Sequence, residues 1–254
     1  MSQLDEGLLA LRDVTKRFGG VAALAGVSFD VQRGEILGVI GPNGAGKTTL
    51  LNCVSGIHRL DGGEIRFDGR SLRGLPPHRV ARLGVGRTFQ IVKPFASMTV
   101  RENAAVGALF GSSDARLPMR RAFAHADEVL ELVGLAAKRS LPVASLTVPD
   151  RKRLEVARAL CTKPRLLLLD EVMAGLNAVE VDDALNMVRA VHGSGVTIVL
   201  IEHVMRVIVG VCSRVVVLHL GRHLAEGQPQ EVLEDERVIQ AYLGEKYASR
   251  HRRD

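Results

Sequence analysis

The spacing with the clearest chemical meaning lies at Gly41–Thr48, which reads Gly-Pro-Asn-Gly-Ala-Gly-Lys-Thr. This segment matches the pattern G-x-x-x-x-G-K-[ST] and follows a continuous apolar run, Ile36–Ile40, of the kind that forms a strand buried on both faces. Glycines let successive backbone N–H groups surround a phosphate, and the helix that follows points its N-terminus at the same anion. The segment therefore predicts a phosphate-binding loop between a strand and a helix.

The side chains of this loop have the types needed to hold ATP with Mg²⁺. Lys47 would neutralise the β- and γ-phosphates as a point charge, and the Thr48 hydroxyl would ligate the metal ion. The other residues expected to line the phosphates are Gly41, Pro42, Asn43, Gly44, Ala45, Gly46 and Thr49. The plainer alternative is a glycine-rich turn with an exposed lysine.

Two carboxylates follow a second apolar run. Leu166–Leu169 predicts a buried strand that ends at Asp170, and Glu171 comes next. Ligands of open α/β sheets bind at the carboxyl edge of such strands, so we expect Asp170 to hold Mg²⁺ directly or through water. Glu171 would face the γ-phosphate and polarise the attacking water. Many strands end in Asp and Glu, so this pattern indicates a nucleotide site only in combination with the phosphate loop upstream.

Two further polar residues are candidates because of their place in the chain. His203 follows the strand predicted at 196–201, from where it can reach a γ-phosphate, although a surface histidine is the alternative. Gln90 closes the segment Gly86–Gln90 at the start of a region without convincing strands, and it could touch Mg²⁺ or its water. Neither residue is informative alone, so both depend on the phosphate loop.

The periodicity of the chain predicts strands that alternate with helices, which is typical of a mostly parallel sheet covered on both faces. The strands expected in that sheet are 36–40, 166–170, 196–201 and 215–218, with helices at 47–55 and 179–191. Short runs near the N-terminus predict an additional β part at 8–11, 27–31 and 62–69. Residues 91–153 show helical register at 102–109 and 121–133, which predicts a helical insertion.

Composition limits the classes of function. The chain has 254 residues, of which 46% are hydrophobic and 24% charged, as in a globular protein with a large core. The net charge of +6 comes from scattered arginines, and with only 4% aromatic residues no nucleic-acid stacking platform is expected. The cysteines lack metal-ligand spacing and predict core residues in a reduced cytosolic compartment; they are Cys53, Cys161 and Cys212.

Neither a signal segment nor a membrane span is expected. The N-terminus carries acids where a signal peptide would carry bases. The most apolar long window, Val196–Cys212, is interrupted by Glu202, His203 and Arg206. If the chain serves transport, other chains must therefore supply the path through the membrane.

The order of these motifs resembles the nucleotide-binding subunit of ABC transporters, across nearly the whole chain. The residues that carry the resemblance are Asn43, Ala45, Gln90, Asp170, Glu171 and His203. It implies an α/β fold with a P-loop NTPase core, whose mostly parallel sheet is joined by an N-terminal antiparallel β part. That core would comprise residues 1–90 and 154–254, with a helical subdomain at 91–153. It also implies that ATP is hydrolysed between two facing subunits.

The resemblance assigns roles to single residues. Phe18 is similar to the aromatic residue that stacks on adenine, with a core position on an edge strand as the alternative. Glu171 resembles the general base, His203 the sensor of the γ-phosphate, and Lys47 the catalytic lysine. Thr48, Gln90 and Asp170 together would hold Mg²⁺.

One segment departs from the family pattern. The family signature reads Leu-Ser-Gly-Gly-Gln before a helix, and the corresponding segment here, Leu146–Asp150, reads Leu-Thr-Val-Pro-Asp before the helix predicted at Arg153–Leu160. Val148 and Pro149 replace both glycines, and Pro149 has no N–H to donate to a phosphate. Because the signature acts on the partner's nucleotide, a heterodimer with a different ATPase subunit is expected. Asn177 also stands where the family usually has Asp.

The subfamily resemblance favours ATPases of branched-chain amino acid importers, through the segments Gly86–Gln90, Met98–Asn103 and Val238–Glu245. It implies transmembrane permease subunits, indirectly a solute-binding protein, and a place on the cytoplasmic face of a bacterial or archaeal membrane. Urea or amide import and lipopolysaccharide export remain as alternatives. A soluble ABC ATPase outside transport and a small-molecule kinase are further alternatives from other classes of function.

Overall fold

The computed structural model describes residues 7–88, 94–111 and 117–250. The chain forms two compact units. The first unit comprises Met1–Leu75 and Val199–Asp254, and the second unit comprises Pro76–Ile198. The helical subdomain expected at 91–153 falls within the second unit, and its limits stay a prediction.

A four-stranded antiparallel sheet opens the first unit, with the strand order β2-β1-β4-β5. Its strands are β1 (Leu9–Phe18), β2 (Val21–Val31), β4 (Gly62–Phe67) and β5 (Arg70–Ser71). The predicted N-terminal antiparallel part is confirmed. β1 and β2 are longer than expected because their outer halves carry polar and exposed residues on one face, which weakens the apolar signal in the sequence.

The second sheet has the strand order β10-β9-β3-β8-β7-β6. Its strands are β3 (Ile36–Ile40), β6 (Val85–Arg87), β7 (Leu166–Asp170), β8 (Thr197–Ile201), β9 (Arg214–His219) and β10 (Arg222–Gly227). β3 pairs with β9 and β6 with β7 in parallel, whereas β9 and β10 form an antiparallel hairpin. All residues of β3, β7 and β8 are buried, as their continuous apolar runs predict.

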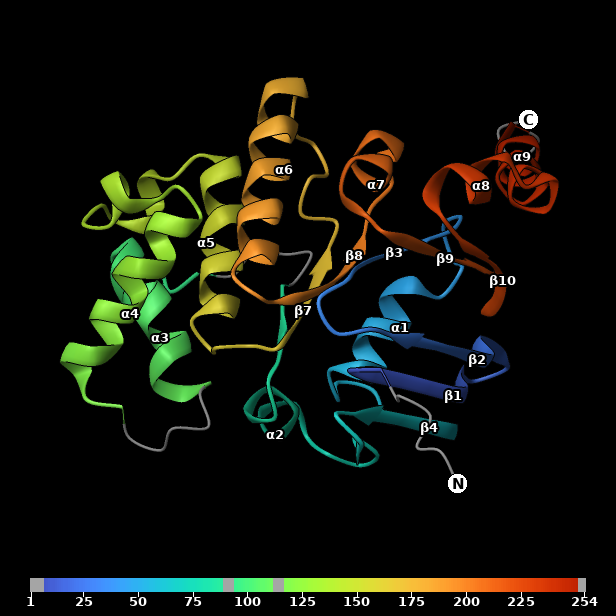
Figure 1. Cartoon of the computed structure of the whole chain (residues 1–254), viewed down its shortest axis with the longest axis horizontal. Coiled ribbons are helices and arrows are strands. Elements are labelled where there is room, and N and C mark those ends of the chain that lie inside the picture. The colour runs from blue at the N-terminus through green and yellow to red at the C-terminus, as the bar shows by residue number, and fades with distance from the viewer. Residues whose placement is uncertain (1–6, 89–93, 112–116, 251–254) are drawn as a thin grey trace. The chain divides into compact units, whose positions relative to one another are not determined.

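Helices of the first unit lie beside its strands (Figure 1). They are α1 (Lys47–Val54), α7 (Met205–Val211), α8 (Pro229–Glu234) and α9 (Glu236–Arg250). The cysteines are buried, as expected, and burial raises the pKa of the Cys53 thiol to about 11. Among the described residues, none of the helices combines the length and apolarity that crossing a bilayer requires.

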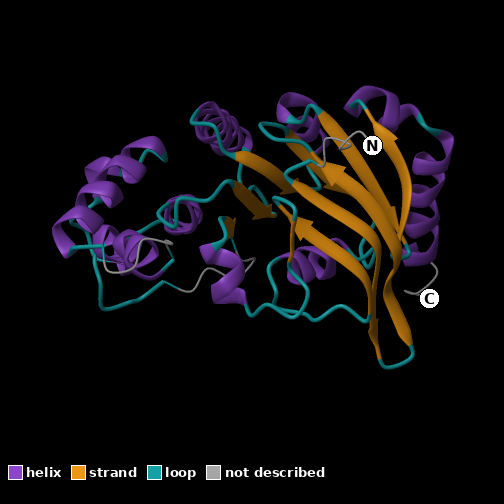
Figure 2. Cartoon of the chain, turned by 60° about the horizontal axis from the view of Figure 1, so that its bottom comes forward, coloured by secondary structure: helices purple, strands orange, loops and turns teal. Residues whose placement is uncertain are grey.

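The second unit is rich in helices (Figure 2). They are α2 (Pro77–Arg82), α3 (Val100–Phe110), α4 (Met119–Leu132), α5 (Val148–Leu160) and α6 (Ala178–Gly193), with 3₁₀ turns at Ala136–Lys138 and Val143–Ser145. α3 and α5 can approach closely because Gly107 of α3 has no side chain. A Cβ at that position would lie only 2.2 Å from the Arg158 carbonyl oxygen of α5. α5 begins at Val148 rather than at Arg153, because Thr147 caps it and Pro149 is tolerated in a first turn.

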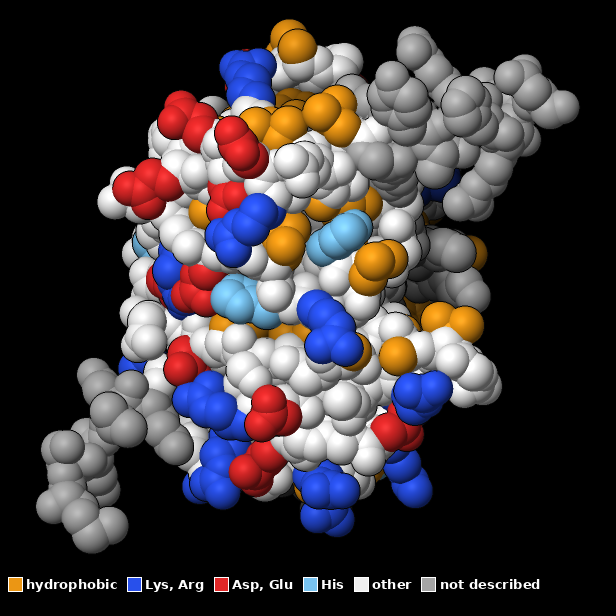
Figure 3. Space-filling model, turned by 90° about the vertical axis from the view of Figure 1, so that its right-hand side faces the viewer, with side chains coloured by type: hydrophobic (Ala, Val, Ile, Leu, Met, Phe, Trp, Pro, Cys, Tyr) orange, Lys and Arg blue, Asp and Glu red, His pale blue; other side chains and the backbone are white. Residues whose placement is uncertain are grey.

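The surface of the first unit carries mixed charge. On the face drawn in Figure 3, Lys and Arg side chains are interspersed with Asp and Glu, and hydrophobic atoms appear in small separate groups. Dispersed charge of both signs is typical of a solvated surface.

Candidate functional site

The phosphate loop connects β3 to α1 in the first unit. Lys47 is the first residue of α1, and its Nζ donates to the carbonyl oxygens of Gly41 at 2.7 Å and Pro42 at 2.9 Å. Its side chain is only 6% exposed, and burying an ammonium group is costly unless it has hydrogen-bond partners. The loop therefore holds a positive charge in place against its own backbone.

Glycines are required in this loop because other backbone segments lie against it. Gly41 has φ +147°, and a Cβ there would lie 2.0 Å from the Leu218 carbonyl oxygen. Gly46 has φ +102°, and a Cβ there would lie 2.5 Å from the Ala23 carbonyl oxygen. Both conformations are in the region that favours glycine.

The remaining residues of the loop divide into two sets. Pro42 and Ala45 are buried and support the turn. Asn43, Gly44 and Thr48 are exposed, and Thr49 is half-buried. The loop thus exposes Gly44 and Thr48 at the surface and holds the Lys47 ammonium buried, a combination that suits an anionic ligand.

Phe18 ends β1 and is 46% exposed, so it is not a core residue. Its ring meets the His58 ring edge-on, with the centroids 5.1 Å apart and the planes at 73°. The Lys16 ammonium lies 5.3 Å from the centre of the Phe18 ring and also pairs with Asp61 at 3.3 Å. Sequence reasoning missed His58 because nothing in its neighbours along the chain indicates the contact.

Asp170 ends β7 in the second unit and is 2% exposed. Its Oδ2 accepts a hydrogen bond from Arg87 Nη2 at 3.1 Å, and its backbone N–H donates to Thr88 Oγ1 at 3.1 Å. β6 places both partners because it pairs directly with β7. Burial lowers the pKa of Arg87, and the carboxylate of Asp170 opposes that shift. Arg87 and Thr88 were missed, although they belong to the same short segment that suggested Gln90.

Glu171 follows β7 with φ +52°, a left-handed conformation that is costly for a residue with a side chain. Its carbonyl oxygen accepts a hydrogen bond from the Ala174 N–H at 3.2 Å, which closes a turn directly after the strand. Strained backbone of this kind is concentrated at functional sites. Asn177 ends the same loop and caps α6, since its Oδ1 accepts from the Glu180 N–H at 3.0 Å.

His203 is the second residue after β8, and it is exposed, whereas the preceding Glu202 is 1% exposed. The phosphate loop, Phe18 and His203 belong to the first unit, and Asp170 and Glu171 belong to the second. Gln90 lies outside the described residues.

The segment that departs from the family signature forms the first turn of α5. Thr147 caps the helix and donates from Oγ1 to Asp150 Oδ2 at 2.8 Å. Lys138 donates to the same oxygen at 2.5 Å. Val148 is 62% exposed at the first helical position. The N-terminus of α5 thus carries a carboxylate of its own.

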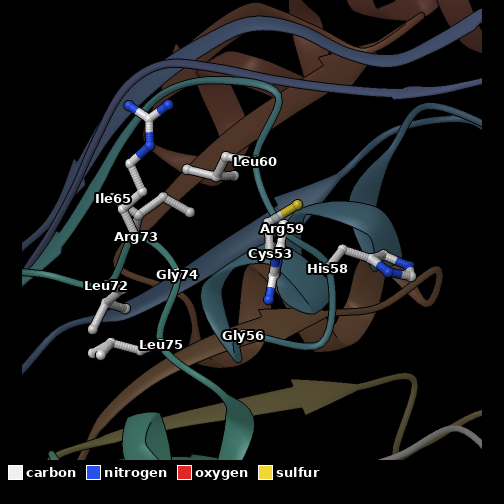
Figure 4. A pocket seen from close by; sticks show the side chains of 10 residues that line it. All are labelled: Cys53, Gly56, His58, Arg59, Leu60, Ile65, Leu72, Arg73, Gly74 and Leu75. Atoms are coloured by element: carbon white, nitrogen blue, oxygen red, sulfur yellow. The ribbon is translucent and has the colours of Figure 1, made fainter.

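A pocket in the first unit is distinct from the phosphate loop. Its lining residues are Cys53, Gly56, His58, Arg59, Leu60, Ile65, Leu72, Arg73, Gly74 and Leu75. Figure 4 shows that the side chains of His58, Arg59 and Arg73 point in different directions. Because ligand sites need polar groups that converge, this pocket offers no comparable arrangement.

Comparison with known proteins identifies the class to which this arrangement belongs. The ABC transporter family matches residues 24–174, and a C-terminal family described as branched-chain amino acid ATP-binding cassette transporter matches residues 222–248. Two solved ATP-binding cassettes of ABC transporters are similar in fold. One is nucleotide-free, with a TM-score of 0.84 and 29% identity over 92% of this chain and 98% of that chain. The other, MJ1267 in its ADP conformation, has a TM-score of 0.84 and 29% identity over 93% and 98%.

Curated relatives agree over almost the full length. The chain is 40% identical to the high-affinity branched-chain amino acid transport ATP-binding protein BraF of Pseudomonas aeruginosa, over 94% of this chain and 98% of BraF. It is 40% identical to LivG of Salmonella typhimurium, described in the same words, over 95% of this chain and all of LivG. The chain therefore belongs to the ABC transporter ATP-binding family. It is an ATPase with the P-loop fold that the sequence predicts.

Proposed function

We propose that this chain binds MgATP on the loop Gly41–Thr49 and hydrolyses it with Glu171 as general base. The observation that carries this proposal is the Lys47 ammonium held over a glycine backbone, since that arrangement is built for a polyphosphate. The remaining members of the set are Phe18 for the adenine, Asp170 and Gln90 for the metal, and His203 for the γ-phosphate. Local position supports each member of the set, because the phosphate loop, His203 and Glu171 each lie just past the carboxyl end of a buried strand.

Mg²⁺ fits the donor types that these positions offer. Thr48 provides a hydroxyl oxygen and Asp170 a carboxylate oxygen, and Mg²⁺ prefers such hard oxygen ligands together with phosphate oxygens and water. When bound, the ion would neutralise charge on the phosphates. The Arg87 contact keeps Asp170 at the end of β7 in a fixed orientation.

Each remaining side chain has one task in hydrolysis. Glu171 accepts a proton from the attacking water, and its left-handed backbone turns the residue away from the path of β7. His203 contacts the γ-phosphate and so distinguishes ATP from ADP. Phe18 offers an exposed aromatic ring on which adenine can stack, with Lys16 and His58 as its supports.

We further propose that ATP hydrolysis here powers the import of branched-chain amino acids. The names of BraF and LivG support this cargo, and so does the C-terminal match at residues 222–248. Transmembrane permease subunits and a solute-binding protein would then be the partners, and the chain would act at the cytoplasmic face of the membrane.

The cargo is tested by reconstituting this chain with its permeases and solute-binding protein in liposomes. We expect ATP-dependent uptake of radiolabelled leucine, isoleucine or valine, and no uptake when Glu171→Gln replaces the wild type. Uptake of urea or an amide in place of these amino acids would contradict the cargo while leaving the ATPase assignment intact. Export of a lipid-linked saccharide would contradict the direction as well.

The second ATPase subunit is proposed to be a different chain. The first turn of α5 lacks one N–H at Pro149 and carries the Asp150 carboxylate, which repels a phosphate. A homodimer would contain this turn twice, once for each nucleotide. In a heterodimer, the ATP on this chain's own loop meets the first turn of a partner with a different sequence.

A further inference from the structure

The hairpin turn between β9 and β10 contains Gly221, whose N–H and carbonyl groups form hydrogen bonds to two different segments of the first unit. The Gly221 N–H donates to the Ala45 carbonyl oxygen at 3.0 Å, and the Gly221 carbonyl oxygen accepts from the Ala25 N–H at 2.7 Å. Ala45 belongs to the phosphate loop and Ala25 to β2. Gly221 therefore joins the phosphate loop to a strand of the antiparallel sheet.

β2 is also the partner of the strand that carries Phe18. In the β1–β2 hairpin, Phe18 is opposite Val21 and Lys16 is opposite Leu24. A shift of β2 near Ala23 would accordingly move the exposed Phe18 ring relative to the phosphate loop. Figure 1 shows the elements concerned, β1, β2, α1, β9 and β10, within the first unit.

No space is left between these segments. A Cβ on Gly221 would lie 2.7 Å from the Ala23 carbonyl oxygen and 3.2 Å from Leu24 Cα. The same Ala23 oxygen would lie 2.5 Å from a Cβ on Gly46 of the phosphate loop. Two glycines therefore approach the Ala23 carbonyl closely, and neither position leaves room for a Cβ. Real side chains do not tolerate such distances, so a Cβ on Gly221 must displace β2.

We propose that Gly221 is a positioning residue that sets the distance between the Phe18 ring and the phosphate loop, so that the base and the phosphates of one nucleotide reach both at once. This inference rests on the proposed role of Phe18. Gly221 itself touches no ligand. Its effect is confined to ligands that carry a base as well as phosphates, because a phosphate chain alone needs only the loop.

The test is Gly221→Ala, with Gly74→Ala as the matched control. Both glycines have φ +75°, so alanine introduces the same backbone strain at either position. A Cβ on Gly74 meets nothing within 4 Å, so the control variant does not displace β2. Binding of MgATP and of Mg²⁺ tripolyphosphate is measured by calorimetry on each purified chain. We expect Gly221→Ala to weaken MgATP binding about tenfold, the order expected for losing a base–aromatic stack, with tripolyphosphate within about twofold of wild type.

Each outcome has a distinct meaning. Equal MgATP affinity in the two variants overturns the proposal, and so does an equal loss for MgATP and tripolyphosphate, which would place the defect in the loop. Adding Phe18→Ala to Gly221→Ala should cost little more than Gly221→Ala alone, because both changes remove the same stack. If Phe18→Ala leaves the MgATP affinity of the wild type unchanged, the proposed role of Phe18 fails instead.

The wild-type chain supplies a measurement that does not depend on the variant folding. If the ligand bridges the Phe18 ring and the phosphate loop, MgATP should slow hydrogen exchange of the Ala25 amide about fivefold or more relative to tripolyphosphate. Equal protection by the two ligands would contradict the proposal.

Discussion

At the scale of single residues, several candidate site residues have buried charges or an unfavourable backbone conformation. Lys47 is a nearly buried ammonium, Asp170 is a buried carboxylate beside Arg87, and Glu171 has a left-handed backbone. Each arrangement costs free energy, and each is held by its surroundings. Within the second unit, Asp170 and Glu171 show two such costs at the carboxyl end of β7.

Lys47→Ala should weaken MgATP binding roughly 30- to 150-fold. The change removes a charge-assisted contact worth about 2–3 kcal/mol to the phosphates. Calorimetry measures the effect, and Lys163→Ala, at an exposed position after α5, is the control for loss of one surface charge. Unchanged ATP affinity in Lys47→Ala would refute the assignment of the loop.

Glu171→Gln should preserve MgATP binding and slow hydrolysis by roughly 10²- to 10⁴-fold, because the amide cannot accept the proton of the attacking water. Phosphate release and nucleotide affinity are measured on the same preparation. Glu234→Gln, at an exposed position on α8, controls for the loss of a carboxylate. Turnover near the wild-type rate would place the base at another residue.

At the scale of secondary-structure elements, local hydrogen bonds decide what each helix start can bind. The first turn of α1 has no acidic residue, and it begins with Lys47, whose ammonium donates to the Gly41 carbonyl oxygen of the glycine-rich loop. The start of α5 has the opposite character. There Thr147 and Lys138 both donate to Asp150, which occupies the positive end of the helix from within the chain.

Stability at acidic pH should depend on the contact between Lys138 and Asp150. Burial raises the pKa of Asp150, but hydrogen bonds from Lys138 and Thr147 lower it by more, so the pKa in the folded state lies below the ordinary value of 3.8. A depressed folded pKa contributes stability above pH 3.8, and that contribution is lost as the pH falls through the folded value.

Lys138→Met should therefore lower the free energy of unfolding by about 1 kcal/mol at neutral pH, with the difference from wild type shrinking in acid. Urea denaturation across the acidic range measures it. In an Asp150→Asn background the same substitution should give a difference that does not change with pH. If the effect of Lys138→Met on the free energy of unfolding did not change with pH in the chain that keeps Asp150, the ion pair between Lys138 and Asp150 would be contradicted.

At the scale of the whole molecule, we expect the phosphate loop and the first turn of α5 to serve different nucleotides. We propose that two ATPase subunits face each other, as the resemblance to ABC transporter ATPases implies. On this proposal, the unusual first turn of α5 would affect the partner's nucleotide, whereas Lys47 and Glu171 would act on this chain's own. The pairing of subunits consequently determines activity.

The purified chain alone should dimerise weakly with MgATP and hydrolyse it slowly. Replacing the turn by Val148→Gly, Pro149→Gly and Asp150→Gln should raise turnover of the homodimer roughly tenfold or more, because backbone donors then face the phosphate. Val179→Gly is the control, since Val179 is a similarly exposed valine in the first turn of α6. Full ATPase activity of the wild-type homodimer would refute the heterodimer proposal.

The sequence by itself determined the elements with strong local signals. The phosphate loop between a buried strand and a helix, the strand that ends at Asp170 and the helix 179–191 all follow from periodicity and glycine spacing over short stretches. β6 was missed because three residues carry too little pattern, and the start of α5 was misplaced because a proline in the first turn was not recognised as a permitted helix start.

Only the tertiary structure decided which residues support the site. Arg87 meets Asp170 across 83 positions of sequence, and Gly221 bonds to Ala45 and Ala25 from the far end of the chain. Such contacts depend on strand pairing and on the close approach of backbone segments, and neither leaves a periodic trace in the residues concerned. Chemistry that follows from residue type and local spacing can be predicted from sequence, whereas the distances that make it work are set by packing between distant segments.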